Sequence, residues 1–131
     1  MPPDNPATVA TGSAVSFPQN GPTDGSVDIT RLSTSTFQLA RIGTYRVSFS
    51  VSVDEAGQLD VTLDGAELPY TVVGRATGTS QIAGESLVQT TSANSVLAVV
   101  NPAGETTTLT ITPQAGGTHP VSATLIVQRV Q

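Results

Sequence analysis

The sequence predicts an all-β protein, built from antiparallel strands as a sandwich or a barrel. Apolar and polar residues alternate along several short runs, which is typical of strands with one buried face. Clusters rich in Gly, Pro, Asn and Asp separate these runs. The best helical candidate, 81–90, is interrupted by Gly84 and ends in two threonines. About nine or ten short strands at this spacing predict a single all-β domain.

The clearest alternation lies in the stretch STFQLARIGTYRVSFSV, residues 35–51, which holds three of the five aromatic residues of the chain. Its core motif is expected to face inward, and we expect Gly43 to let the chain turn into the strand. The small polar residues between the motif positions are expected to face outward. The motif consists of Phe37, Gly43, Tyr45, Val47, Phe49 and Val51, and the outward residues include Ser48, Ser50 and Ser52.

The other strands follow in chain order. A strand is predicted near 27–32, and another over 57–63 with Leu59, Val61 and Leu63 inward. Asp64-Gly65 then predicts a two-residue hairpin turn. Residues 74–84 are expected to be a flexible connection, and residues 105–112 alternate again.

Two further segments, 95–100 and 121–130, are apolar on both faces. A strand of this kind needs cover on both sides, and a second subunit is one way to provide it. The alternative is cover by loops or by the N-terminal segment.

Composition excludes several functions. The chain has no cysteine and no lysine, so it lacks disulfides and thiolate metal sites, and its formal net charge is −5. An acidic chain without a basic patch argues against nucleic acid or an anionic membrane as a partner. The N-terminus has no basic residue and no apolar run, so no signal peptide is expected.

No catalytic motif is evident, and we expect no enzymatic activity and no cofactor. The single histidine, His119, lies in a Gly- and Pro-rich loop without a nearby nucleophile motif. Asp54, Glu55, Asp60 and Asp64 are the only concentration of acidic residues. We expect Asp60 and Asp64 to lie on the solvated face of a strand, and calcium binding by the group is the alternative. Residues 74–84 lack the lysine of a phosphate-binding loop. Carbohydrate binding is disfavoured, because the chain has no Trp and few aromatics outside the core.

The spacing of Phe37, Gly43, Tyr45, Val47 and Phe49 resembles the second half of the signature of the tumour-necrosis-factor-like and complement-globular-head jelly rolls. In the first half, Phe17 is in place, whereas Thr23 stands where the family has Asn or Asp. Over residues 14–131 the chain is most similar to the C-terminal head of the Bacillus collagen-like spore-surface glycoproteins. AVSFP, VTLDGAELP and ATLIVQRV occur in the same order as in that domain.

This resemblance implies a ten-strand, two-sheet jelly roll that assembles as a homotrimer. The central strand and the C-terminal strand would lie in one sheet, nearest the threefold axis. Combined with the doubly apolar strands, it predicts a trimer interface formed by Ser48, Ser50, Val96, Ala98, Val100, Thr124, Ile126, Gln128 and Val130.

Residues 1–13 are expected to form an extended Pro-rich arm outside the head, which spans 14–131. No collagen stalk precedes the head, so we expect the head to be the whole protein. The arm is predicted to dock on a particle through Pro2, Pro3, Asn5, Pro6, Thr8 and Val9. We therefore expect a structural protein on the surface of a virion, as a capsid decoration or fibre head. The alternatives are a spore-surface head and a lectin-type or adhesin-type receptor-binding module.

Overall fold

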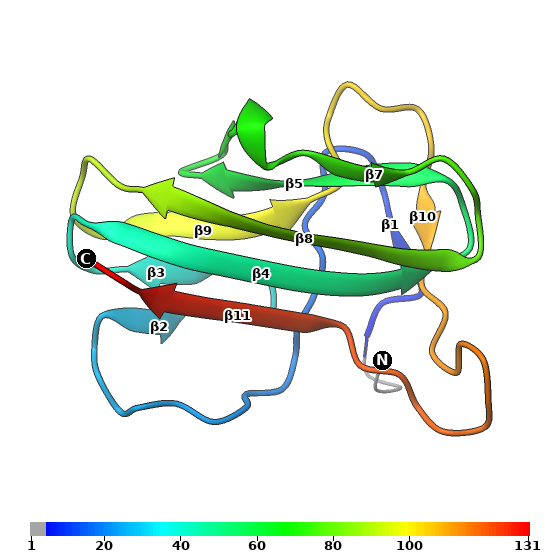
Figure 1. The fold of residues 1–131 in the computed structure, drawn as a ribbon, viewed down its shortest axis with the longest axis horizontal. Coiled ribbons are helices and arrows are strands. Elements are labelled where there is room, and N and C mark those ends of the chain that lie inside the picture. Colours follow the sequence, from blue (N-terminus) through cyan, green and yellow to red (C-terminus); the bar gives the residue numbers. More distant parts are fainter. Residues whose placement is uncertain (1–4) are drawn as a thin grey trace.

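The computed structural model, described here for residues 5–131, confirms the all-β, antiparallel fold. One sheet has the strand order β2-β3-β9-β5-β6, with β7 also paired to β5, and the other has the order β11-β4-β8. Figure 1 shows the β11-β4-β8 sheet stacked in front of the first one. We call the β2-β3-β9-β5-β6 sheet the back sheet and the β11-β4-β8 sheet the front sheet. Within the described residues, no helix is long and apolar enough to span a bilayer.

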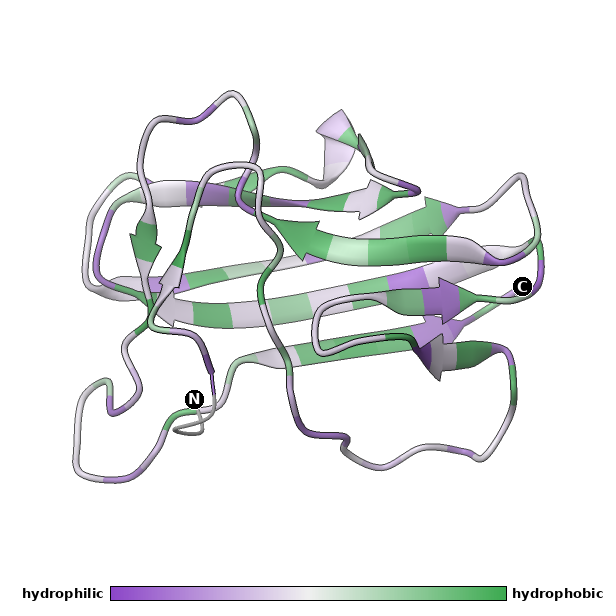
Figure 2. Cartoon of the chain, turned by 180° about the vertical axis from the view of Figure 1, so that it is seen from behind, coloured by the Kyte–Doolittle hydropathy of each residue, from purple (hydrophilic) through white to green (hydrophobic). Residues whose placement is uncertain are grey.

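The back sheet consists of Ile29–Arg31 (β2), Phe37–Leu39 (β3), Gly57–Leu63 (β5), Ala66–Glu67 (β6), Val73–Arg75 (β7) and Ser95–Val100 (β9). The front sheet consists of Thr44–Val53 (β4), Ser80–Gln89 (β8) and Thr124–Arg129 (β11). Thr8–Val9 (β1) pairs with Leu109–Thr110 (β10), and Pro69–Thr71 form one turn of 3-10 helix (η1). Hydrophobic and polar residues alternate along the strands, as Figure 2 shows from behind.

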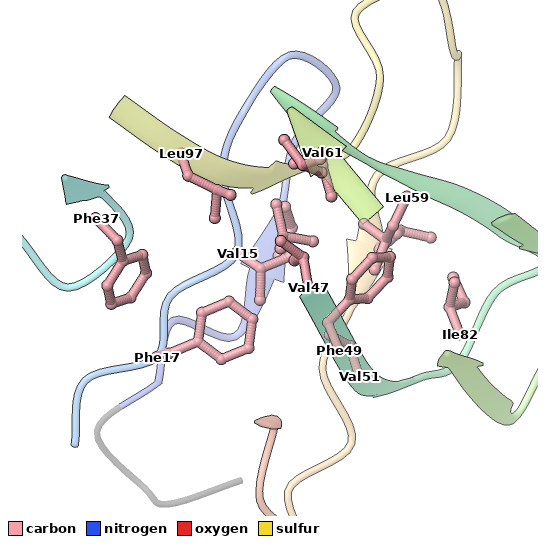
Figure 3. Close-up of a cluster of buried hydrophobic side chains, with 14 of the residues drawn as sticks. Val15, Phe17, Phe37, Val47, Phe49, Val51, Leu59, Val61, Ile82 and Leu97 are labelled. Atoms are coloured by element: carbon pink, nitrogen blue, oxygen red, sulfur yellow. The ribbon is translucent and has the colours of Figure 1, made fainter. Parts of the chain in front are cut away.

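The core lies between the two sheets and is built from the alternate residues of their strands. Tyr45, Val47 and Phe49 of β4 point inward and are almost completely buried. Phe17 and Phe37 pack against each other with ring centroids 6.5 Å apart, close to Val15 and Leu97 (Figure 3). The alternation in the sequence thus produces one continuous core between the sheets.

The hairpin between β5 and β6 has the turn predicted from Asp64-Gly65. Both residues have positive φ angles, 51° and 82°, as a type I′ turn requires. The prediction for residues 74–84 is wrong, because only 76–79 form a connection and β8 already begins at Ser80. Gly84 lies inside β8 because Val73 and Phe49 pack closely over it. A Cβ there would lie 2.9 Å from Val73 and 3.1 Å from Phe49.

The described part of the predicted arm, residues 5–13, is not separate from the head. Val9 is 5% exposed and belongs to the core, and β1 is paired antiparallel with β10. The buried amide of Asn101 donates hydrogen bonds to the Val9 carbonyl at 3.0 Å and to the Thr107 carbonyl at 2.9 Å. An expected boundary after residue 13 is therefore not seen, because backbone pairing and burial of Val9 hold this segment in the sandwich.

The sandwich is closed on one side and open on the other. On the closed side, β7 connects the sheets, since Arg75 Nε on β7 donates to the Gln81 carbonyl on β8 at 2.7 Å. On the open side, the edge strands β2 and β11 border one groove. The loop between Phe17 and β2 forms the outer wall of this groove and stands away from the sheets (Figure 1).

Candidate functional site

The outer surface of the front sheet contains most of the residues predicted for subunit contact. Register places Gln128, Arg46 and Leu87 in one row across β11, β4 and β8, and Ile126, Ser48 and Glu85 in the next. Three large apolar side chains on this surface are exposed: Leu87 by 59%, Ile126 by 53% and Val130 by 49%. We call this surface the front face; it consists of Arg46, Ser48, Ser50, Ala83, Glu85, Leu87, Thr124, Ile126, Gln128 and Val130.

The centre of the front face is low, because β4 contributes the small residues Ser48 and Ser50 there. Exposed apolar side chains rise on both sides of this strip, Ile126 on β11 and Leu87 on β8. Among the described residues, the front face has one ion pair, between Arg46 and Glu85 at 2.7 Å. Both side chains are partly exposed. Such exposed pairs add little stability, so the main property of this face is its shape and its apolar rim.

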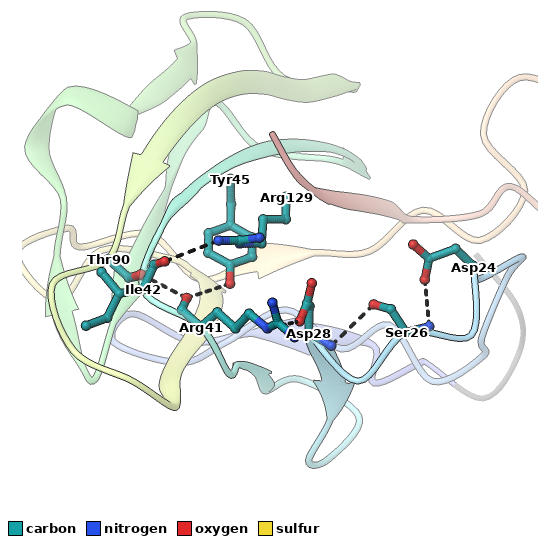
Figure 4. A network of polar contacts seen from close by, with 8 residues as sticks. All are labelled: Asp24, Ser26, Asp28, Arg41, Ile42, Tyr45, Thr90 and Arg129. Carbon is teal, nitrogen blue, oxygen red and sulfur yellow. Dashed lines mark hydrogen bonds and ion pairs between the residues drawn. The ribbon is translucent and has the colours of Figure 1, made fainter. Parts of the chain in front are cut away.

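The turn into β4 is held by a polar network at one end of the sandwich. The hydroxyl of the buried Tyr45 donates to the Arg41 carbonyl at 2.7 Å, and Thr90 Oγ1 accepts the Gly43 N–H at 3.0 Å. Arg41 is also paired with Asp28 at 3.0 Å (Figure 4). This network fixes the start of the central strand.

Gly43 has a different role from the one expected. It is not among the glycines with positive φ, so the turn itself does not require glycine. A Cβ at this position would instead collide with the carbonyl oxygen of Gln131 and come close to the Arg129 side chain. Gly43 is therefore needed for the close approach of the chain after β11.

The residues predicted for subunit contact on β9 lie elsewhere. β9 belongs to the back sheet and β11 to the front sheet, so their outer surfaces point in opposite directions. Ala98 is 8% exposed and Val100 is 9% exposed, whereas Val96 is half-buried. One flat contact therefore cannot contain both sets of residues. The chain itself buries most of β9, and within the sheet Val100 is flanked by Asp60 on one side and Ala14 on the other.

Some of the residues predicted for docking on a particle are buried in the structure and others are exposed. Val9 is buried, and the Asn5 side chain donates to the Ser16 carbonyl at 2.7 Å. Pro6 and Thr8 are exposed. Pro2 and Pro3 lie outside the described residues.

The groove on the open side has a volume of about 1410 Å³. Arg31 lies along it, with its guanidinium 5.0 Å from the centre of the Phe37 ring and its Nε donating to Asn20 Oδ1 at 2.6 Å. The other wall is β11, whose inward residues Leu125 and Val127 are only partly buried. The sequence signal for this groove is the loop PQNGPTDG, one of the Gly-, Pro-, Asn- and Asp-rich clusters that separate the strand-like runs.

The remaining candidate residues do not converge on one point. His119 is exposed in the loop after β10. Glu55 accepts hydrogen bonds from the N–H and the hydroxyl of Thr110, both at 2.6 Å. Burial opposes ionisation of Glu55, but these hydrogen bonds outweigh it and hold the pKa of its carboxyl below the usual value. Asp64 Oδ1 accepts the Val96 N–H at 2.9 Å.

In residues 5–131, no group of three or more His, Cys, Asp or Glu side chains is placed to hold a metal ion. The expectation that Asp60 lies on a solvated strand face is wrong, because this residue is completely buried and Thr62 is only 5% exposed. Alternation along β5 correctly predicts that both side chains point away from the core. It contains no information about which segments cover the outer surface of the sheet.

No family model matches this chain. A search of curated proteins also finds no significant match.

Proposed function

We propose that this protein is a non-enzymatic structural component, a tumour-necrosis-factor-like jelly roll that assembles as a homotrimer on the surface of a particle. The observation that carries the proposal is the front face, where exposed Leu87, Ile126 and Val130 border a strip of small residues. Exposed apolar side chains that gather on one face are typical of protein interfaces.

The strand order supports the jelly-roll part of the proposal. The chain passes from β3 in the back sheet to β4 in the front sheet, and then to β5 in the back sheet. It crosses again from β8 to β9 and ends at β11 beside β4. Two antiparallel sheets joined by such crossings are typical of jelly rolls. The pairing of β4 with β11 also agrees with the arrangement that the family resemblance implies.

A subunit contact on the front face fits the size of ordinary interfaces. A stable contact buries roughly 800 Å² on each partner, and three strands with apolar side chains at the rim offer a surface of this order. A closed ring of three copies would bury the same face in every subunit. The small side chains of Ser48 and Ser50 would let the backbones of neighbouring subunits approach each other closely.

The particle that we favour is a virion, with the spore surface as the alternative. Attachment would involve the N-terminal end, where Pro6 and Thr8 are exposed. A lectin function receives less support, because the exposed Tyr70 on η1 is not among the residues that line the groove. Antibody labelling of virions and of spores from the source, viewed by electron microscopy, distinguishes these hosts; labelling of neither would contradict surface display.

Light scattering coupled to gel filtration tests the assembly. The intact chain is expected at about 40 kDa, which is three times its mass of 13.3 kDa. Ile126→Asp should shift the protein towards the monomer, because the interface would then bury an unpaired charge. Val27→Asp is the matched control, since Val27 is 76% exposed on the loop before β2. A monomeric intact chain, or an unchanged oligomer in Ile126→Asp, would contradict the proposed interface.

A further inference from the structure

Asp60 is a buried carboxyl group to which no N–H or O–H group of the described residues donates a hydrogen bond. Its relative exposure is 0%, and neither carboxyl oxygen meets a donor. It lies on the outer surface of β5, opposite Val100 of β9. A buried carboxylate without a donor is unstable, because it has lost its water and gained nothing in return.

The charged groups around Asp60 give no compensation. Glu67 on β6 faces the same side, because it is paired with Thr62, two residues along β5 from Asp60. Asp64, in the turn after β5, already accepts a hydrogen bond from the Val96 N–H. Arg75, the one cation on β7, lies on the other surface, where it is bonded to β8. β9 has no charged residue, and Tyr70, the titratable residue of η1, is 63% exposed.

Burial raises the pKa of Asp60 to about 7, and the hydrogen bond and negative charge of Glu67 contribute to this. Around neutral pH the folded protein therefore exchanges a proton at this residue. A protonated Asp60 can donate its O–H to the Glu67 carboxylate, which is a diagonal neighbour across the β5–β6 pair. Without that proton, two carboxylates would face each other with no donor between them.

The segment that contains Glu67 is held to β5 by few contacts. The Leu68 N–H donates to the Val61 carbonyl at 3.0 Å, and the Val61 N–H donates to Thr71 Oγ1 at 2.8 Å. Only Thr62 and Leu63 are paired with β6, and most of residues 64–72 are exposed. Segments with few buried contacts open at low free energy, so a change at one of these contacts can control them.

We propose that Asp60 and Glu67 form a proton-controlled latch that holds residues 64–72 against β5 when one proton is shared between the two carboxyl groups. Loss of this proton to the solvent leaves two facing carboxylates and releases the segment from the edge of β5. The latch is independent of the proposed assembly, since it lies on the back sheet, away from the front face.

Hydrogen exchange of backbone amides tests the latch. The N–H groups of Val61 and Leu68 report on the segment, and their protection, corrected for intrinsic rates, should fall at least about tenfold between roughly pH 5.5 and pH 8.5. In Asp60→Asn the protection should stay high at both pH values, because the amide donates to Glu67 without a titrating proton. Glu85→Gln is the control, since it removes a carboxylate of the front face and should keep the pH dependence of the intact chain.

Two results would overturn the proposal. One is protection of Val61 and Leu68 that does not change with pH, or that changes equally in Asp60→Asn. The other is protection restored by added calcium at the higher pH, which would make the pair a cation site and not a proton latch. If Asp60→Asn does not fold, the carboxyl carbon of Asp60 in the intact chain is followed by NMR instead. A titration near neutral pH supports the latch, and one near the ordinary value of 3.8 contradicts it.

Discussion

Single residues in this protein are best explained by what approaches them. Neither Gly43 nor Gly84 has a positive φ angle, so the backbone conformation does not require glycine at either position. At both positions, however, a Cβ would meet another atom at close range. The sequence shows only that they are glycines inside strand-like segments. Alternation predicted the inward positions of β4, because it depends on local geometry alone. The neighbours of Gly43 come from the far end of the chain, so local patterns could not predict them.

Gly84→Ala should destabilise the protein by about 1–3 kcal/mol, because the new methyl group would push against Val73 and Phe49. Gly104→Ala is the control, since nothing lies within 4 Å of a Cβ there. Its free energy of unfolding should stay within about 0.5 kcal/mol of the intact chain. Urea denaturation of the two variants gives both values. Equal effects would show that the close contact over Gly84 is absent.

At the scale of the element, β1 and the sheet position of β9 were not predicted. β1 has only two residues, too few for a period to appear, and the prolines before it predict an arm. Its place depends on β10 and on Asn101, nearly one hundred residues later. β9 is apolar on both faces, and this pattern indicates cover without saying whether another subunit or the same chain provides it. The low exposure of Ala98 and Val100 in the single chain shows that the same chain covers most of this strand.

Val9→Ala should lower the free energy of unfolding by roughly 2 kcal/mol, because it removes buried methyl groups from the core. Thr8→Ala, at the exposed neighbouring position, should have an effect within about 0.5 kcal/mol. Thermal or chemical denaturation of both variants measures the difference. If both are neutral, residues 5–9 are not part of the sandwich, and the arm expected from the sequence would be correct after all.

At the scale of the whole molecule, Asp60 makes stability depend on pH. Its pKa is near 7 in the folded protein and near 3.8 when unfolded, so the folded state binds more protons between these values. Stability should therefore fall as the pH rises through this window, by an amount on the order of a few kcal/mol. Glu55 has the opposite effect, because its lowered pKa gives stability that is lost only as the pH falls below its ordinary value of 4.5.

The melting temperature of the intact chain is accordingly expected to be several degrees lower at about pH 8 than at about pH 5.5. Asp60→Asn should remove most of this difference and melt higher than the intact chain at the upper pH. Differential scanning calorimetry in buffers of equal ionic strength measures both. A melting temperature that rises with pH in this window would show that Asp60 is ionised in the folded protein.

One edge of β4 pairs with two separate pieces of chain: Ile111 is opposite Val53, and Thr124 is opposite Ser50. The chain between them leaves the edge of β4 as a loop and then returns to it. At the base of this loop, the Val121 N–H donates to the Pro113 carbonyl at 2.8 Å. Residues 114–120 are all exposed. The pairing along β4 thus already accommodates an inserted loop, and a hydrogen bond holds the two ends of this loop side by side. A foreign peptide grafted between Gly116 and Gly117 would inherit this anchored base, which makes the loop a natural position for presenting an epitope or an affinity tag.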